Sequence, residues 1–120
     1  MDLWTAQLRY GGPDRLDITV QGKDPVGSIF APTWDMVRRY KEAVKLNKVV
    51  EAIETYTTAY WTLMDYRLPN AGSTVSWILS RKEVTFVCFC PAGAFCHRVL
   101  ISNLLDKNVP DIHYRGERKL

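Results

Sequence analysis

The segment over residues 84–90 is apolar at nearly every position, and this run constrains the fold more than any other feature of the chain. A strand with one face in water alternates apolar and polar residues, whereas a strand covered on both faces is continuously apolar. We therefore expect a buried strand of a parallel sheet, with helices above and below it. A turn over residues 90–95 and a helix over residues 96–107 are expected to follow this strand.

The rest of the chain supplies further helices and strands. Helices are expected over residues 3–10, 34–45, 49–64 and 74–79, and strands over residues 15–20 and 111–114. Thr33 is placed to cap the second of these helices, and Ser73 to cap the fourth. Because strands and helices follow one another and crossovers are right-handed, we expect a small three-layer α/β domain with a mostly parallel, Rossmann-like sheet.

The length and composition are those of one globular domain. The chain has 120 residues, so residues 1–120 are expected to form a single α/β domain. Hydrophobic residues at 47% and charged residues at 24% exclude a disordered chain. We expect neither a membrane span nor a secretory signal, because no apolar run is long enough. The odd number of cysteines favours reduced thiols in the cytoplasm.

Chemically reactive side chains gather where the buried strand gives way to the helix. Ligands of parallel α/β sheets collect beyond the carboxyl ends of the strands, and a helix N-terminus attracts anions. Arg98, in the first turn of this helix, can grip a phosphate or a carboxylate in two places. The same positive field lowers the pKa of a nearby thiol, so Cys90 and Cys96 are candidate nucleophiles, with His97 as a proton carrier.

Cys96 and His97 are not expected to form a catalytic pair by themselves, because the side chains of neighbouring helical residues point about 100° apart around the helix axis. Asp17 and His113 are two further candidates to reach the same edge of the sheet, where either could act as a base or an orienting group. Together with Arg98 they form the candidate ligand-binding set. Alternatively, Arg98 pairs with Asp17 or with a backbone carbonyl and serves only the fold.

The cysteines have structural interpretations that stay open at this point. Cys88 lies inside the buried strand and is expected in the core. Cys90 and Cys96 stand at the two ends of the loop and could form a redox-switchable bridge. A zinc site made of Cys88, Cys90, Cys96 and His97 is not expected, because their spacing differs from that of the usual zinc knuckles.

The cysteine-containing segment also carries a family resemblance. A strand that leads to Cys90, a short loop with Pro91, and an apolar helix that opens on Cys96, His97 and Arg98 resemble the domain-of-unknown-function family 488. In that family a strand ending in a cysteine-bearing segment leads into a Cys-His-Arg motif. The resemblance implies an α/β fold and a site at this motif, but no reaction.

Other parts of the chain are similar to the same family. Its members carry an aspartate in the first strand, and Asp17 matches that position. Many members have an arginine two residues later, where this chain has Thr19. The turn over residues 30–34 and the closing residues 114–117 are similar to a short subgroup of the family. The resemblance therefore spans most of the chain, although only the Cys-His-Arg motif is specific.

Two hypotheses for the function follow. The first is a small-ligand protein that binds a nucleotide or another anion at residues 90–98, with cysteine-dependent chemistry left open. The alternative is a non-enzymatic nucleic-acid or protein-binding module that uses the basic 38–48 stripe and the tail over residues 115–120. A solvated amphipathic helix shows the same stripe. The sequence leaves any cofactor, the oligomeric state and the presence of any catalysis open.

Overall fold

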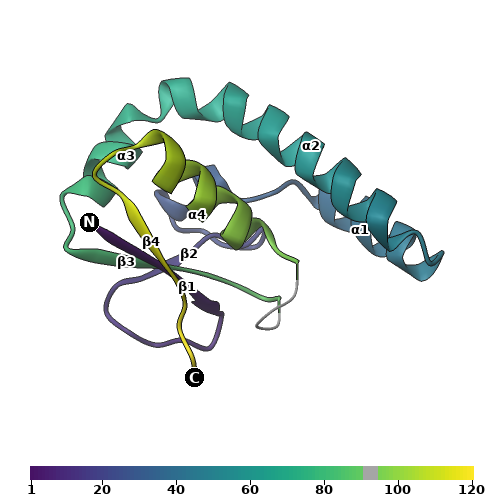
Figure 1. Cartoon of the computed structure of the whole chain (residues 1–120), viewed down its shortest axis with the longest axis horizontal. Coiled ribbons are helices and arrows are strands. Elements are labelled where there is room, and N and C mark those ends of the chain that lie inside the picture. The colour runs from purple at the N-terminus through teal and green to yellow at the C-terminus, as the bar shows by residue number, and fades with distance from the viewer. Residues whose placement is uncertain (91–94) are drawn as a thin grey trace.

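The computed structural model describes residues 1–90 and 95–120 (Figure 1). In chain order the elements are β1 (Asp2–Gln7), β2 (Arg15–Asp17), the 3-10 helix η1 (Gly27–Phe30), α1 (Trp34–Lys45), α2 (Val49–Arg67), the 3-10 helix η2 (Leu68–Asn70), α3 (Gly72–Leu79), β3 (Glu83–Cys88), α4 (His97–Asn108) and β4 (His113–Glu117). Residues 91–94 of the expected turn lie outside the described residues.

The four strands form one parallel sheet in the order β2-β3-β1-β4. β1 pairs with β3 on one side and with β4 on the other, and β2 pairs with the far side of β3. Gln7 stands opposite Cys88, whereas Asp2 stands opposite His113. Cys88 therefore lies at the carboxyl edge of the sheet and His113 at its amino edge. The parallel sheet confirms the α/β fold class that the buried 84–90 run predicts.

The two faces of the sheet are covered differently. Leu3 and Phe86 point into the core that the strands share with the helices. On the opposite face the Arg118 guanidinium lies 4.4 Å from the centre of the Trp4 ring and donates to Thr85 Oγ1 at 2.9 Å. Figure 1 shows α2, α3 and α4 above the sheet and the loop from β1 to β2 below it. The third layer is this loop and the C-terminal tail, which corrects the expectation of helices on both faces.

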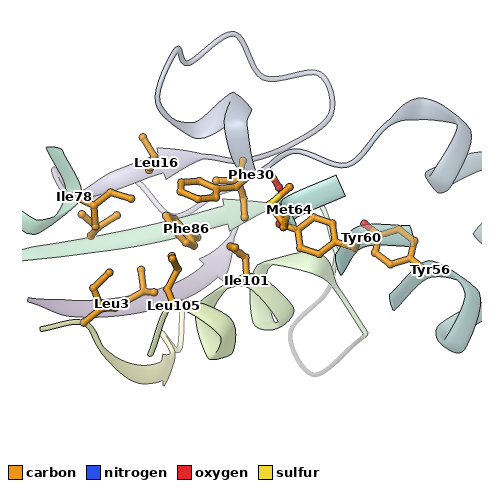
Figure 2. Packing of buried hydrophobic residues seen from close by; sticks show 13 residues of the cluster. Leu3, Leu16, Phe30, Tyr56, Tyr60, Met64, Ile78, Phe86, Ile101 and Leu105 are labelled. Atoms are coloured by element: carbon orange, nitrogen blue, oxygen red, sulfur yellow. Dashed lines mark hydrogen bonds between the residues drawn. The ribbon is translucent and has the colours of Figure 1, made fainter. Parts of the chain in front are cut away.

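The core gathers around Phe86 of β3 (Figure 2). The rings of Phe30 and Phe86 pack with their centres 5.1 Å apart. Met64, Tyr60 and Tyr56 form a row along α2, and the Tyr60 hydroxyl donates to the carbonyl of Phe30 at 2.7 Å. These contacts hold η1 and α2 beside the end of β3. The carboxyl edge of the sheet therefore faces the hairpin formed by α1 and α2.

The helix expected over residues 3–10 is wrong, because β1 occupies this segment. Leu3, Thr5 and Ala6 have no exposed surface, since β1 lies between two paired strands. A short apolar run is compatible with either a buried helix or a buried strand, and here the hydrogen bonds from both neighbours decide in favour of the strand.

The helices expected over residues 34–45 and 49–64 are confirmed as α1 and α2, although α2 continues to Arg67. Thr33 caps α1, since its side chain accepts a hydrogen bond from the Met36 amide at 3.2 Å. α3 begins at Gly72, so Ser73 lies inside that helix and does not cap it. Within residues 1–90 and 95–120, no helix combines the length and apolar content needed to cross a membrane.

The strands expected near the two ends of the chain exist with different bounds. β2 has three residues and ends at Asp17, where the aspartate side chain accepts a hydrogen bond from the Thr19 amide and turns the chain. β4 spans His113–Glu117 instead of residues 111–114. Gly116 adopts a φ of 111° beside the register shift between β4 and β1, a conformation that favours glycine. Because of the longer β4, Glu117 reaches the carboxyl edge of the sheet.

α1 and α2 form a hairpin that extends beyond the sheet (Figure 1). Asn47, between the two helices, adopts a φ of 59°, which asparagine tolerates better than most residues. Every residue of α1 keeps part of its surface exposed. Asp35 pairs with both Arg38 and Arg39, so part of the basic stripe is neutralised within the helix itself.

Candidate functional site

Two cysteine sulfurs meet where β3 ends and α4 begins. Cys88 is the last residue of β3, and Cys96 is the residue that immediately precedes α4. Their sulfur atoms lie 2.6 Å apart, both side chains are buried, and both thiols are free. Cys90 is partly exposed and lies two residues after Cys88. The strand end and the helix start therefore bring Cys88 and Cys96 into contact, with Cys90 at the edge of this cluster.

His97 completes the cluster from the first turn of α4. Its Nε2 lies 2.7 Å from the carbonyl oxygen of Ile18, and its Nδ1 lies 3.6 Å from Cys96 Sγ. A carbonyl oxygen only accepts hydrogen bonds, so Nε2 carries the proton and the unprotonated Nδ1 faces the Cys96 thiol as an acceptor. The donor atoms of Cys88, Cys96 and His97 lie within 4.8 Å of one another. The spacing of these residues in the sequence does not predict a metal site, but their donor atoms lie close together in space.

Arg98 is the most deeply buried charge near the cluster, with 1% of its surface exposed. Its Nη1 donates to Cys88 Sγ and to the Cys90 carbonyl, each at 2.9 Å. Its Nε and Nη2 donate to the two carboxylate oxygens of Glu117 at 3.1 and 2.7 Å. The fork of this guanidinium therefore binds Glu117 in two places. An external anion would have to compete with that carboxylate.

The cluster distributes its protons unequally among the three thiols. Hydrogen bonds with Cys90 and Cys96 lower the pKa of the Cys88 thiol well below its usual value, and the charge of Arg98 acts in the same direction. The hydrogen bond with Cys88 raises the pKa of Cys90 and of Cys96. These shifts favour the thiolate form at Cys88, beside the guanidinium, over a thiolate at Cys90 or Cys96. Burial lowers the pKa of His97, so the imidazole is neutral at pH 7.

A pocket of about 370 Å³ opens beside the cluster, between the hairpin and the carboxyl edge of the sheet. This volume is within the range of small-ligand sites, which is about 300–1,000 Å³. The residues that line it come from four segments of the chain. They are Thr19, Val20, Gln21, Pro32, Trp34, Val37, Tyr40, Lys41, Tyr56, Cys88, Phe89, Cys90, Phe95, Cys96 and His97.

Aromatic rings make up much of the pocket wall. Phe95 packs against Tyr40 of α1 and Tyr56 of α2, with ring centres 5.5 and 5.4 Å apart. Trp34 and Phe89 are respectively 56% and 58% exposed although both line the pocket. Exposed aromatic surface beside a cavity is available for stacking with a ligand. Lys41 is the one lysine or arginine among the described lining residues.

The candidate site residues predicted from the sequence are divided by the structure. Cys90, Cys96, His97 and Arg98 come together at the carboxyl edge of the sheet. Asp17 lies at the end of β2 near His97, and its carboxylate accepts a hydrogen bond from the Thr19 amide. His113 is the first residue of β4, opposite Asp2, so it lies at the amino edge. This placement corrects the expectation that it approaches the same edge.

Two parts of the site are not predicted by the sequence pattern. Glu117 binds Arg98 from the end of β4, and the correct end of that strand would have placed its carboxylate at this edge. Trp34, Tyr40 and Lys41 occur at the spacing of one face of α1, and they form the pocket wall. That spacing is compatible with either core packing or a ligand site. The structure distinguishes the two, because the hairpin of α1 and α2 extends beyond the sheet and places these side chains along the pocket.

Fold and site together define a parallel α/β domain with a buried cysteine, histidine and arginine cluster beside an aromatic pocket. No family model matches the chain, and neither a curated protein nor a solved structure is significantly similar to it.

Proposed function

We propose that the protein binds a small, flat ligand with a negative charge, such as a nucleotide, in the pocket between the hairpin and the carboxyl edge of the sheet. The observation that carries this proposal is the pocket itself, which has about 370 Å³ of space and exposed aromatic rings in its wall. A flat ring system would bury the exposed surfaces of Trp34 and Phe89 by stacking. Such a ligand matches the position at which parallel α/β sheets commonly bind small molecules.

The preference for an anion rests on Lys41 and on the start of α4. Lys41 lines the pocket, and the partial positive charge of a helix N-terminus favours negative groups near His97. Arg98 contributes less than the sequence predicts, because Glu117 already binds its guanidinium. We therefore assign recognition of the negative group to Lys41, with Arg98 in a supporting role behind the cysteines.

The proposal concerns binding, and any cysteine chemistry would start from Cys90. Cys88 and Cys96 are buried, whereas Cys90 is partly exposed and lines the pocket. It is therefore the thiol that a bound ligand would contact first. Free thiols at this position also fit a reducing, cytoplasm-like compartment, which we include in the proposal.

Binding is best tested with AMP, adenosine and inorganic phosphate as probes, by calorimetry and by the intrinsic tryptophan fluorescence, to which Trp34 in the pocket wall contributes. AMP is expected to bind more tightly than adenosine or phosphate alone, because it offers both a ring and a charge. Lys41→Gln is expected to weaken AMP binding about fivefold, the equivalent of about 1 kcal/mol for one exposed charge contact. Adenosine binding should not change in this variant.

Lys45→Gln is the matched control, since Lys45 lies one helical turn further along α1 and is exposed. It removes the same charge and should leave AMP binding unchanged. Equal weakening by both variants would indicate a general charge effect instead of a pocket. Absence of binding for all three probes at millimolar concentration would contradict the nucleotide proposal.

We also propose that the chain is related to the domain-of-unknown-function family 488. The support is the Cys96-His97-Arg98 motif, which opens α4 directly after the loop that follows β3. A member of that family with a known structure should then show the strand order β2-β3-β1-β4 around the motif. A different strand order around the motif would contradict the proposed relationship between this chain and the family.

A nucleic-acid module remains the second candidate, because Lys41, Lys45 and Lys48 are exposed along α1 and the following turn. Asp35 reduces the charge at the other end of this stripe by pairing with Arg38 and Arg39. Binding to generic DNA or RNA through several phosphates should weaken steeply with added salt. If the affinity for DNA and RNA does not change with salt, the small-ligand proposal is the better one.

A further inference from the structure

We propose that Cys88, Cys90, Cys96 and His97 form a binding site for one Zn²⁺ ion at the floor of the pocket. This inference goes beyond the proposed ligand and does not depend on it. Three thiolates and a neutral imidazole are a known set of ligands for structural zinc. The donor atoms of Cys88, Cys96 and His97 already lie within 4.8 Å of one another.

The distances fit tetrahedral coordination after a small movement. With Zn–S bonds of about 2.3 Å and Zn–N bonds of about 2.0 Å, neighbouring ligand atoms in a tetrahedron are about 3.5–3.8 Å apart. Cys96 Sγ and His97 Nδ1 are separated by 3.6 Å, which matches this value. The sulfurs of Cys88 and Cys96, at 2.6 Å, would have to separate by about 1 Å. Side-chain rotation at the two cysteines is sufficient for such a change.

The orientation of His97 is the second observation that points to a metal. Its side chain is 6% exposed, and its Nε2–H donates to the Ile18 carbonyl at 2.7 Å. Histidines that bind metals commonly donate their other ring N–H to a carbonyl or a carboxylate, which fixes the tautomer. Here this bond leaves the Nδ1 lone pair on the side of the thiols. The imidazole is thus arranged as a ligand before any ion binds.

Arg98 supplies a positive charge that offsets the negative charge of the three thiolates. Zn²⁺ with three thiolates and one neutral histidine carries one net negative charge, buried in the protein. The Arg98 Nη1 donates to Cys88 Sγ at 2.9 Å, and a guanidinium bond to a metal-bound sulfur stabilises such a site from the outer shell. Glu117 in turn holds the guanidinium in place through two hydrogen bonds.

Cys90 would provide the fourth ligand after its side chain turns toward the other three donors. It is partly exposed, lines the same pocket and follows Cys88 by two residues, but its sulfur does not belong to the group of donor atoms that lie within 4.8 Å of one another. It comes from the chain just after β3, whereas Cys96 and His97 come from the start of α4. A zinc ion would therefore join the end of the strand to the start of the helix. Four protein ligands close the site, which is typical of a structural zinc centre.

The test is the metal content of the full chain, expressed with zinc in the medium and purified with a reductant and without a chelator. About one equivalent of Zn²⁺ is expected, as measured by plasma mass spectrometry. After removal of zinc, Co²⁺ should give the thiolate charge-transfer absorption and the intense visible bands of tetrahedral cobalt. Loss of an outer-shell partner weakens metal binding about 10–100-fold. His97→Gln removes a direct ligand, so it should weaken Zn²⁺ binding by more than this.

His113→Gln is the matched control, because His113 is the other histidine and lies exposed at the opposite edge of the sheet. It should keep full zinc content. The cobalt spectrum of the wild-type chain decides the question even if His97→Gln does not fold. A folded wild-type chain with three reactive thiols that gives only the spectrum of hydrated cobalt would overturn the proposal. Isolation with a Cys88–Cys96 disulfide in place of zinc would also overturn it. The AMP titration uses Lys41 and is read separately, so the two proposals can fail independently.

Discussion

Asp14 shows at the residue scale how one carboxylate can join distant segments of this chain. It accepts hydrogen bonds from Tyr10 at 2.6 Å, from Thr85 of β3, and from Arg118 of the tail at 3.1 Å. Burial acts to raise the pKa of Asp14, but these hydrogen bonds outweigh it and hold the pKa below the usual 3.8. The carboxylate therefore stabilises the fold only in its charged form.

The stability of the protein should accordingly fall in acid. The pKa of Asp14 is lower in the folded chain than in the unfolded chain, so the unfolded state binds the proton more readily. Its contribution is complete well above the unfolded pKa of 3.8 and is lost as the pH falls from there through the lower folded pKa. Urea unfolding at pH 7, 5 and 3 measures this loss. Asp14→Asn should cost about 1–3 kcal/mol at pH 7 and reduce the change with pH.

Asp35→Asn is the comparison for this experiment, because Asp35 is an exposed partner of two arginines on α1. Its effect at pH 7 should be below about 1 kcal/mol, as for other surface ion pairs. An acid dependence that is the same in the wild type and in Asp14→Asn would contradict the assignment to Asp14.

Arg98 illustrates a different use of a single residue. Its guanidinium is buried, and it contacts a thiol, a backbone carbonyl and a carboxylate at the same time. A lysine could not replace this planar fork, because its ammonium group cannot bind the two oxygens of Glu117 side by side. The residue therefore ties the reactive segment to the last strand of the sheet.

At the scale of elements, the N-cap of α1 is the clearest local device. Thr33→Ala removes the hydrogen bond to the Met36 amide, and we expect a loss of about 1 kcal/mol in the free energy of unfolding. Ser73→Ala is the matched control, because Ser73 lies inside α3 and is exposed. It should change the stability by less than about 0.5 kcal/mol. Chemical unfolding followed by circular dichroism measures both, and equal losses would show that the α1 cap is unimportant.

The elements with a strong periodic pattern were predictable from the sequence. The 84–90 run predicted β3, and the spacing of apolar residues predicted α2. β1 was not predictable in this way, because its residues become a strand only through pairing with β3 and β4. The end of β4 was missed for a related reason, since Gly116 resembles a terminating residue although it fits a bulge in the strand.

The candidate site was predictable only in part. The sequence places Cys96, His97 and Arg98 at a helix start, and the structure confirms that position. It does not show that Cys88 turns toward Cys96 or that Glu117 binds Arg98, because these contacts join segments whose relative position depends on the whole sheet. Spacing rules for zinc ligands do not bear on the proposed zinc site for the same reason, since they describe ligands on one local loop.

At the scale of the whole molecule, the hairpin of α1 and α2 is the least anchored part. Its first helix keeps all of its residues partly exposed, whereas β3 is buried at every residue after Glu83. Segments with few buried contacts open more easily than the core of a sheet. We therefore expect the pocket wall formed by Trp34, Tyr40 and Lys41 to open more easily than the part of the site at the end of β3.

Amide hydrogen exchange followed by mass spectrometry should resolve this difference. Amides of α1 are expected to exchange well before those of β3, and the C-terminal half of α2, held by Tyr60 and Met64, should follow β3 more closely. Added AMP, if it binds as proposed, should slow exchange in α1 and leave the centre of β3 unchanged. Equal protection of α1 and β3 in the free protein would contradict the expectation.

The strand order has a consequence for how the protein is made. β1 is synthesised before the other described elements, yet both of its hydrogen-bonding neighbours, β3 and β4, lie in the last third of the 120 residues. Until residue 83 has been synthesised, the nascent strand has no partner in its own sheet, and such unpaired apolar segments are prone to aggregate. Folding of this sheet therefore has to wait until β3 and β4 have been synthesised, and chaperones should bind the nascent β1 segment until then.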